Sequence, residues 1–414
     1  MTDPIQRDYE RAQEFLAEGQ FQKVLAVLTR MRDQDENDPR TIEIAGDLAK
    51  EHGDLDEAEQ LYLRLDDFKD DPEVRGIGQL SLGFLSLEQD DSRAACERFA
   101  EACRWFNDAR AIDHLTLAFG ALGQARAGRG EYREAVNAFR SLIQAANQWE
   151  EPEELAGPVA EATRQLADVL RLLGELDEAE STFRDAIARF EDFEHLEGKA
   201  NCLDGLGIIA QIRGRYDEAE TLHLKALKIN KLLDHEEGMS VNYGNLTMLN
   251  LHRKDLDRAE RYARKALKID RRLENANGVA HFYNLLGQIE TDREHFQSAE
   301  DAFTKAEKLY RSCGDREDLA SVTSHFGVLY RKWGRLDEAE ARTLNAMTMA
   351  EEMSHGDGLA ATHDELALIR KSQGRIDEAR ALWLKALALY EELQSRRMIA
   401  EVRAQLEQLD AESP

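Results

Sequence analysis

The side chains that most often carry catalysis form no catalytic pattern in this sequence. It contains no His-Glu-x-x-His zinc motif, no Gly-x-Ser-x-Gly nucleophile elbow and no Gly-x-x-x-x-Gly-Lys-Ser/Thr phosphate-binding loop. His281 and His325 are expected on adjacent segments, but two histidines without a third ligand do not define a metal site. No Cys-x-x-Cys pair occurs among the four cysteines, Cys96, Cys103, Cys202 and Cys313. We therefore expect no metal, no cofactor and no enzymatic activity.

The sequence does offer residues suited to non-covalent binding, and these residues recur at positions spaced 40 residues apart. On a helical wheel these positions lie opposite the core face, where amides and small polar residues accompany an apolar strip. An exposed apolar strip usually marks a partner site, although packing on the next helix would explain it too. The candidate partner-binding residues are Asn201, Asp204, Ile208, Gln211, Asn245, Met248, Leu251, His281, Asn284, Gln288, Val328, Arg331, Leu368 and Lys371.

Two pairs of basic residues end the last two of these stretches. Arg331 stands beside Lys332, and Arg370 beside Lys371. Guanidinium and ammonium groups bind carboxylates and phosphates through charge-assisted hydrogen bonds, so an acidic or phosphorylated peptide is one candidate ligand. Ordinary solvated charge at helix ends explains the same residues, and we favour that interpretation.

These residues need a scaffold with the same repeat, and the sequence contains one. Segments of the type Gly174-Glu-Leu-Asp-Glu-Ala179 recur from residues 174, 214, 254, 294, 334 and 374, and weaker copies start at 19, 53, 90 and 130. Glycine followed by acidic residues predicts a turn between two helices, because glycine tolerates left-handed backbone and acids favour a helix N-terminus. Alanines such as Ala179 and Ala186, two helical turns apart, indicate close helix packing.

This pattern resembles the tetratricopeptide repeat, in the 40-residue form of kinesin light chain and the Leu-Gly-Asn-repeat scaffold proteins. The resemblance covers nearly the whole chain. It implies an all-α solenoid of about ten tandem helix–turn–helix repeats in a right-handed superhelix, whose first helices line a concave groove. It also implies that Asn245 and Asn284, each in an Asn-Leu pair, contact a bound peptide. The five regular units after residue 200 lack the lysine and asparagine of a chaperone-type carboxylate clamp.

The regularity of the repeat changes along the chain. Residues 1–150 hold irregular repeats, residues 151–159 a longer connection with prolines, and residues 160–395 six regular repeats. Residues 396–410 repeat the pattern of a first helix without a second one after it. Because the last repeat of a solenoid must be covered, we expect this segment to be a C-terminal capping helix.

Composition narrows the class of partner. The chain has 82 acidic and 54 basic residues and a net charge of −28, which opposes binding to nucleic acids or anionic membranes. No run of 18 apolar residues predicts membrane insertion, and the first residues lack the order of a secretory signal. We therefore expect a cytoplasmic protein whose partner is another protein or a peptide segment.

Two functions fit these features. The first is a scaffold or adaptor that binds an extended or partly helical segment of a partner in the concave groove. The alternative is a regulatory receptor of the bacterial type, in which a short peptide binds the groove and changes the superhelix. Such receptors carry an N-terminal helical bundle, whereas here the repeats begin close to residue 5. An enzyme on a solenoid frame is a third class, to which no motif points.

Overall fold

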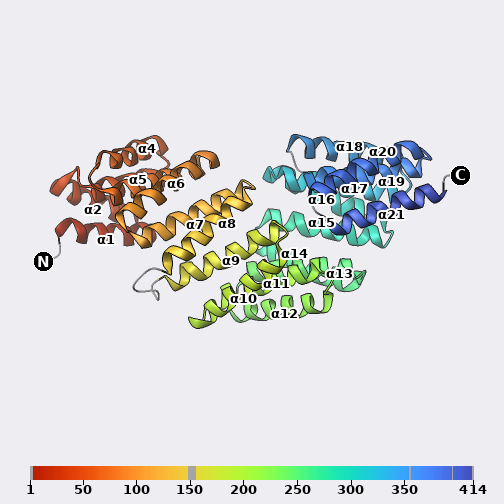
Figure 1. The fold of residues 1–414 in the computed structure, drawn as a ribbon, viewed down its shortest axis with the longest axis horizontal. Coiled ribbons are helices and arrows are strands. Elements are labelled where there is room, and N and C mark those ends of the chain that lie inside the picture. The colour runs from red at the N-terminus through yellow and green to blue at the C-terminus, as the bar shows by residue number, and fades with distance from the viewer. Residues whose placement is uncertain (1–2, 148–154, 354–355, 394, 413–414) are drawn as a thin grey trace. The chain divides into compact units, whose positions relative to one another are not determined.

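The chain folds as a series of antiparallel helices in a computed structural model that describes residues 3–147, 155–353, 356–393 and 395–412 (Figure 1). Within these ranges the regular elements are 21 α-helices and one short 3₁₀ helix, Leu65–Asp67. The chain divides into two compact units, Met1–Gly205 and Leu206–Pro414. The expected all-α class is therefore confirmed.

The helices follow one another with short turns. The first ten are α1 Pro4–Ala17, α2 Phe21–Asp35, α3 Pro39–Glu51, α4 Leu55–Arg64, α5 Pro72–Glu88, α6 Ser92–Ala109, α7 Ile112–Gly128, α8 Tyr132–Ala146, α9 Ala156–Leu172 and α10 Leu176–Asp192. The rest are α11 Leu196–Ile212, α12 Tyr216–Leu232, α13 Glu236–His252, α14 Leu256–Arg272, α15 Ala276–Asp292, α16 Phe296–Cys313, α17 Arg316–Lys332, α18 Leu336–Glu352, α19 Gly356–Ser372, α20 Ile376–Glu392 and α21 Arg396–Glu412. From α9 onward each helix begins 20 residues after the one before it, so two helices make one 40-residue repeat.

Each of the ten predicted turns contains a residue with left-handed backbone. Seven are glycines, for example Gly174 with φ 79° and Gly334 with φ 81°. The other three are Asp90, Lys254 and Glu294, with φ of 59°, 58° and 62°. Glycine accepts this conformation without a steric penalty, which explains why it dominates the turn. The ten predicted helix pairs are therefore confirmed.

Close approach between the two helices of a repeat explains the glycine inside the first helix. A Cβ placed on Gly287 would lie 2.4 Å from the ring of Phe303, which is 16 residues further on. The same arrangement joins Gly83 to Phe99. The predicted small-residue pair, Ala179 and Ala186, is fully buried. Small residues thus let large apolar side chains of the facing helix fill the interior.

Within each unit, the first helices of successive repeats form a layer of their own. Direct contacts join α1 to α3, α3 to α5 and α7 to α9 in the first unit. In the second unit they join α13 to α15, α15 to α17 and α17 to α19. Because the first helices approach one another most closely, they form the inner side of the stack, and side chains 40 residues apart become neighbours on it.

The last helix, α21, covers the end of the stack, as predicted for a cap. Val402 and Leu409 of α21 are 1% exposed and belong to one apolar cluster with Trp383 and Tyr390 of α20. The predicted division of the chain around residues 151–159 stays a prediction, because residues 148–154 lie outside the described ranges.

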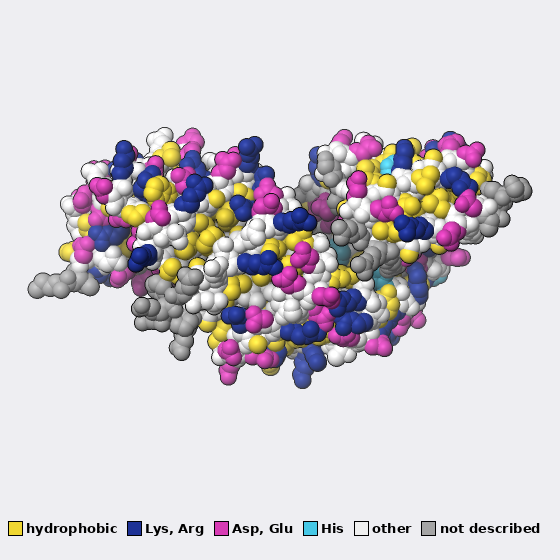
Figure 2. Space-filling model, viewed as in Figure 1, with side chains coloured by type: hydrophobic (Ala, Val, Ile, Leu, Met, Phe, Trp, Pro, Cys, Tyr) yellow, Lys and Arg dark blue, Asp and Glu magenta, His cyan; other side chains and the backbone are white. Residues whose placement is uncertain are grey.

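Charged side chains are prominent on the surface, where acidic and basic groups alternate over short distances (Figure 2). Many of them pair between neighbouring repeats, as Arg253 does with Glu220 and Arg293 with Glu260. Among the described residues, no helix combines the length and apolar character that crossing a membrane requires.

Candidate functional site: cavities on the inner helix layer

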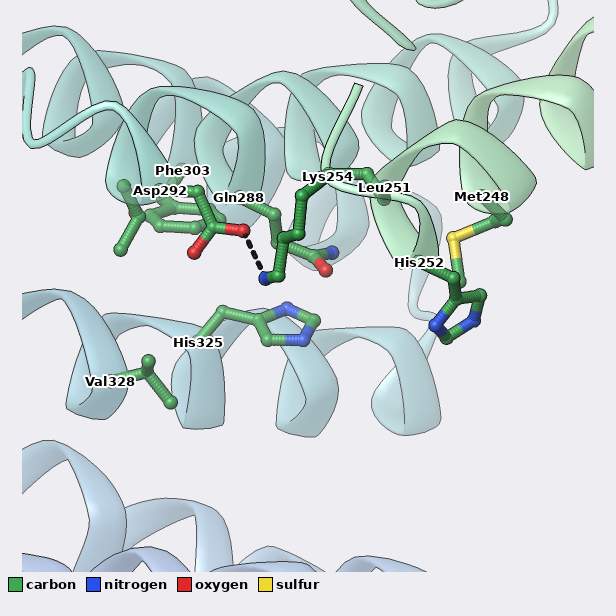
Figure 3. A pocket seen from close by; sticks show the side chains of 10 residues that line it. Met248, Leu251, His252, Lys254, Gln288, Asp292, Phe303, His325 and Val328 are labelled. Atoms are coloured by element: carbon green, nitrogen blue, oxygen red, sulfur yellow. Dashed lines mark hydrogen bonds and ion pairs between the residues drawn. The ribbon is translucent and has the colours of Figure 1, made fainter. Parts of the chain in front are cut away.

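Three successive first helices of the second unit, α13, α15 and α17, enclose a cavity of about 250 Å³ (Figure 3). Four of the predicted binding residues line it: Met248 and Leu251 from α13, Gln288 from α15 and Val328 from α17. They come together because these helices pack side by side. The other residues that line this central cavity are His252, Lys254, Thr291, Asp292, Phe303 and His325.

A neutral histidine forms part of the wall of the central cavity. Nδ1 of His325 donates a hydrogen bond to Oδ1 of Asn284, at 2.8 Å. Burial lowers the pKa of His325 to about 4, and the nearby His281 acts in the same direction. The ring is therefore uncharged at pH 7, and its Nε2 is a hydrogen-bond acceptor. Figure 3 shows the ring directed into the cavity.

A charged cluster borders the same cavity. Asp292 accepts hydrogen bonds from Lys254 at 2.8 Å and from Lys332 at 2.7 Å. Burial acts to raise the pKa of Asp292, but these two hydrogen bonds outweigh it and the pKa is lowered. Asp292 thus stays ionised and links residues of three consecutive repeats. Figure 3 shows its contact with Lys254.

A second cavity, of about 560 Å³, shares Met248 with the central cavity and lies toward the N-terminal ends of α13 and α15. We call it the acidic cavity, because Glu237, Asp270 and Asp318 line it and no lysine or arginine is among its lining residues. Two further predicted residues, Asn245 and His281, belong to it. Its remaining lining residues are Ser240, Val241, Gly244, Asn275, Asn277, Gly278 and Phe282.

The structure brings six of the fourteen predicted residues into these two cavities, and a seventh, Asn284, holds His325 in place. Neither cavity is lined by the other seven, which are Asn201, Asp204, Ile208, Gln211, Arg331, Leu368 and Lys371. Asn201 and Asp204 belong to the first compact unit.

The helical-wheel expectation of an exposed face is wrong at some of these positions. Asp204 is 8% exposed, Asn284 4% and Leu251 9%. The reason is that first helices contact first helices of adjacent repeats as well as their own second helix, which covers part of the wheel opposite the core. By contrast, Met248, Gln288 and Val328 are each partly exposed.

The predicted basic end of the groove is largely neutralised by carboxylates of neighbouring repeats. The Nε of Arg331 donates to Glu365 at 2.5 Å, and Lys332 pairs with Asp292 at 2.7 Å. Arg370 donates to Glu340 at 2.6 Å, and this pairing helps to lower the pKa of Glu340 to about 2. These contacts favour solvated and paired charge over an anion-binding site. Among the described residues, no group of three or more histidine, cysteine, aspartate or glutamate side chains is placed to hold a metal ion.

Sequence reasoning missed the acidic residues of the second cavity, although the repeat register contains a signal. Asp270 occupies the position at which other repeats have Phe190, Tyr310 and Tyr390, at multiples of 40 residues. Asn230 occupies the same position one repeat earlier. A buried carboxylate in place of an aromatic ring is an exception within the repeat and marks this place as unusual.

Comparison with known families agrees with this geometry. Models of the tetratricopeptide repeat match residues 158–231 and 239–312, and a further one matches residues 359–393. The chain contains tetratricopeptide repeats. The specific resemblance to kinesin light chain stays a prediction. No curated protein sequence matches the chain.

Solved structures share the arrangement of the tetratricopeptide repeats at low sequence identity. The apo form of RapI is 13% identical, with a TM-score of 0.68 over 86% of this chain and 99% of RapI. The apo form of the quorum sensor NprR from B. thuringiensis is 15% identical, with a TM-score of 0.60 over 83% of this chain and 98% of NprR. Aspartyl phosphate phosphatase F from Bacillus subtilis is 13% identical, with a TM-score of 0.59 over 84% of this chain and 94% of the phosphatase. At these identities the likeness is one of fold.

Proposed function

We propose that this protein is a non-enzymatic interaction module that binds a short segment of a partner protein along α13, α15 and α17. The observation that carries the proposal is the central cavity. Met248, Gln288 and Val328, which are 40 residues apart in sequence, line one space on the inner helix layer. Candidate binding residues of three successive repeats thus line a single cavity.

The character of the two cavities favours a peptide as the occupant. Apolar side chains such as Met248, Val328 and Val241 provide area to bury, and Asn245 and Gln288 provide amide groups for hydrogen bonds to a backbone. Ligand sites combine a mostly apolar wall with a few polar groups in this way. The net charge of −28 opposes a nucleic-acid partner.

The experiment is a selection of random short peptides displayed on phage against the full-length protein, followed by affinity measurements on single variants. We expect selected peptides to bind the native protein and to lose at least tenfold in affinity with Met248→Glu or Val328→Glu, because a carboxylate in an apolar wall must be desolvated on binding. The matched control is Leu344→Glu, which adds the same charge at a residue 36% exposed on the second helix α18. Equal affinity of the peptide for all of these proteins, or the absence of any selected peptide, would exclude the central cavity as the binding site.

A peptide-responsive receptor is the second candidate, and the buried polar residues of two neighbouring repeats favour it. His223 and Asn230 of α12 are at most 1% exposed, and Asp270 of α14 is 3% exposed. The equivalent residues of α10 are Phe183 and Phe190. Fewer apolar contacts there make a change in the stacking of α12 to α15 less costly. The fold is also that of NprR, which is described as a quorum sensor.

Small-angle scattering with and without a selected peptide distinguishes these two candidates. A receptor is expected to change its radius of gyration at saturating peptide, because binding shifts the population of stacking arrangements. A rigid adaptor is expected to give superimposable curves. Met248→Glu with the same peptide is the control for effects that do not arise from the groove.

A further inference from the structure

The acidic cavity combines an apolar wall with three carboxylates and has no lysine or arginine among its lining residues. Its apolar part comes from Val241 and Met248 of α13 and Phe282 of α15. Val241 is 58% exposed, which is unusual for a β-branched apolar residue on the inner layer of a packed solenoid. Its acidic part comes from three different helices, through Glu237, Asp270 and Asp318.

Neutral side chains, rather than lysine or arginine, surround the two more buried carboxylates. Asp270 is 3% exposed and accepts hydrogen bonds from Ser240 and Asn275. Asp318 lies close to the hydroxyl of Tyr310, which acts to lower its pKa against the effect of burial. Burial raises the pKa of both carboxyl groups, and in Asp270 the neighbouring Glu237 adds to the effect of burial.

Elsewhere in the second unit, two shielded carboxylates have basic partners, and a third, Asp364, accepts a hydrogen bond from Trp383 at 2.8 Å. Glu365 is paired with Arg331, and Asp292 with two lysines. Since buried charges are normally paired, a cavity lined by three carboxylates and by no lysine or arginine is unusual. Such a lining is expected of a site that receives its cation from a ligand.

A third feature of this cavity is an amide group with an unused donor. Nδ2 of Asn245 is buried and has no hydrogen-bond partner within the described structure. Asn245 lies on α13 between Val241 and Met248, on the wall of the cavity. Buried donors without partners are rare, so a carbonyl oxygen supplied by a ligand is a suitable acceptor.

We propose that the acidic cavity binds a lysine or arginine side chain of the peptide that occupies the groove. The aliphatic stem would pack on Val241, Met248 and Phe282, and the cationic head would reach Asp270 and Asp318. Long basic side chains bury their methylene groups on apolar surface and keep the charged head among acceptors. A backbone carbonyl of the same peptide would accept from Asn245. This inference rests on the proposed function and adds the chemistry of one ligand residue.

The peptide selection described above also tests this inference, because it reports sequence preference as well as binding. Selected peptides are expected to be enriched in lysine or arginine at one position beside an apolar residue. In a selected peptide with arginine at that position, replacing the arginine by citrulline, which keeps the shape and removes the charge, is expected to weaken binding by about ten- to a hundredfold.

Charge-removing variants locate the effect on the protein. In Glu237→Gln/Asp318→Asn, the basic and citrulline peptides are expected to bind with nearly equal affinity. Asp270→Asn is measured as well, with its thermal melt, because Asp270 also holds Ser240 and Asn275. Glu274→Gln is the matched control, since Glu274 lies in the turn between α14 and α15 and does not line the cavity.

The two proposals fail in different ways. Selected peptides without a preferred basic residue, or an equal affinity of the basic and citrulline peptides for the native protein, would overturn the cation site and leave the proposed function standing. A citrulline effect that persists undiminished in both carboxylate variants would also overturn it. The absence of any selected peptide would overturn both proposals.

Discussion

At the scale of single residues, one glycine allows two helices to pack closely. A Cβ on Gly287 would lie 2.4 Å from Phe303, which is 1% exposed and lines the central cavity. We expect Gly287→Ala to destabilise the protein by about 1–3 kcal/mol, because an extra methyl group in a filled interior displaces its neighbours. Urea unfolding measures the change in the free energy of unfolding.

Gly128→Ala is the control for this substitution. Gly128 is also helical, and a Cβ there would meet no atom within 4 Å. Because alanine favours a helix over glycine, this variant is expected to be unchanged or stabilised by up to about 1 kcal/mol. A loss of stability in Gly128→Ala equal to that in Gly287→Ala would contradict a role for the contact with Phe303.

His325 predicts a dependence of stability on pH. Burial lowers its pKa to about 4 in the folded protein, from an ordinary value of 6.5. Between these two pH values the unfolded chain binds a proton that the folded chain does not, so stability falls as the pH falls from about 6.5 toward 4. The expected slope is on the order of 1 kcal/mol per pH unit.

The substitution His325→Gln isolates this contribution, since glutamine still offers a donor to Asn284 and does not titrate. Thermal melts of both proteins between pH 7 and pH 5 are expected to converge as the pH falls, because only the native protein loses this contribution. Parallel curves would show that His325 does not titrate as its burial implies.

At the scale of elements, the capping helix α21 is expected to stabilise the C-terminal repeats through its apolar contacts. Leu409 is 1% exposed and belongs to the cluster around Trp383. We expect Leu409→Ala to cost about 2–5 kcal/mol, from lost burial and the cavity left behind. The control is Leu393→Ala, because Leu393 at the end of α20 is 40% exposed and its truncation is expected to cost less than about 1 kcal/mol. Urea unfolding with equal losses for the two variants would argue against a specific role of the cap.

Two of the turns show when a local sequence pattern is enough to predict the backbone conformation. The turn at residue 174 was predictable from a glycine followed by acids, and Gly174 has the expected positive φ. The turn at residue 294 lacks glycine, yet Glu294 adopts the same conformation. There the 40-residue register predicted the turn, because packing of the adjacent helices imposes the conformation on whichever residue stands at that position.

At the scale of the whole molecule, stability arises from stacking within the two units Met1–Gly205 and Leu206–Pro414. A single repeat cannot cover both of its helices, so each depends on its neighbours. Ion pairs such as the one between Arg293 and Glu260 also join adjacent repeats. The surplus of acidic residues lies mostly in the first unit, which has 46 acidic and 23 basic residues, whereas the second has 36 and 31.

The sequence by itself determined the repeat register, the helix pairs, the buried alanines and the cap. These features depend on local periodicity and on small residues such as Ala179 and Gly287, which can be identified without knowing the neighbours. It also identified Met248 and Val328 as binding candidates. The sequence did not show that the side chain of Asn284 is buried, since that burial depends on how closely the first helices of adjacent repeats approach one another.

Only the tertiary structure decided which of these side chains share a cavity. His325 and Asn284 are 41 residues apart, and Lys254 and Asp292 are 38 apart, so their contacts exist only because adjacent repeats stack with a particular offset. The same stacking brings Glu237, Asp270 and Asp318 from three helices to one cavity. A periodic sequence specifies which residues are equivalent. Packing specifies which of them meet, because the offset between repeats is set by the interlocking of whole helix surfaces.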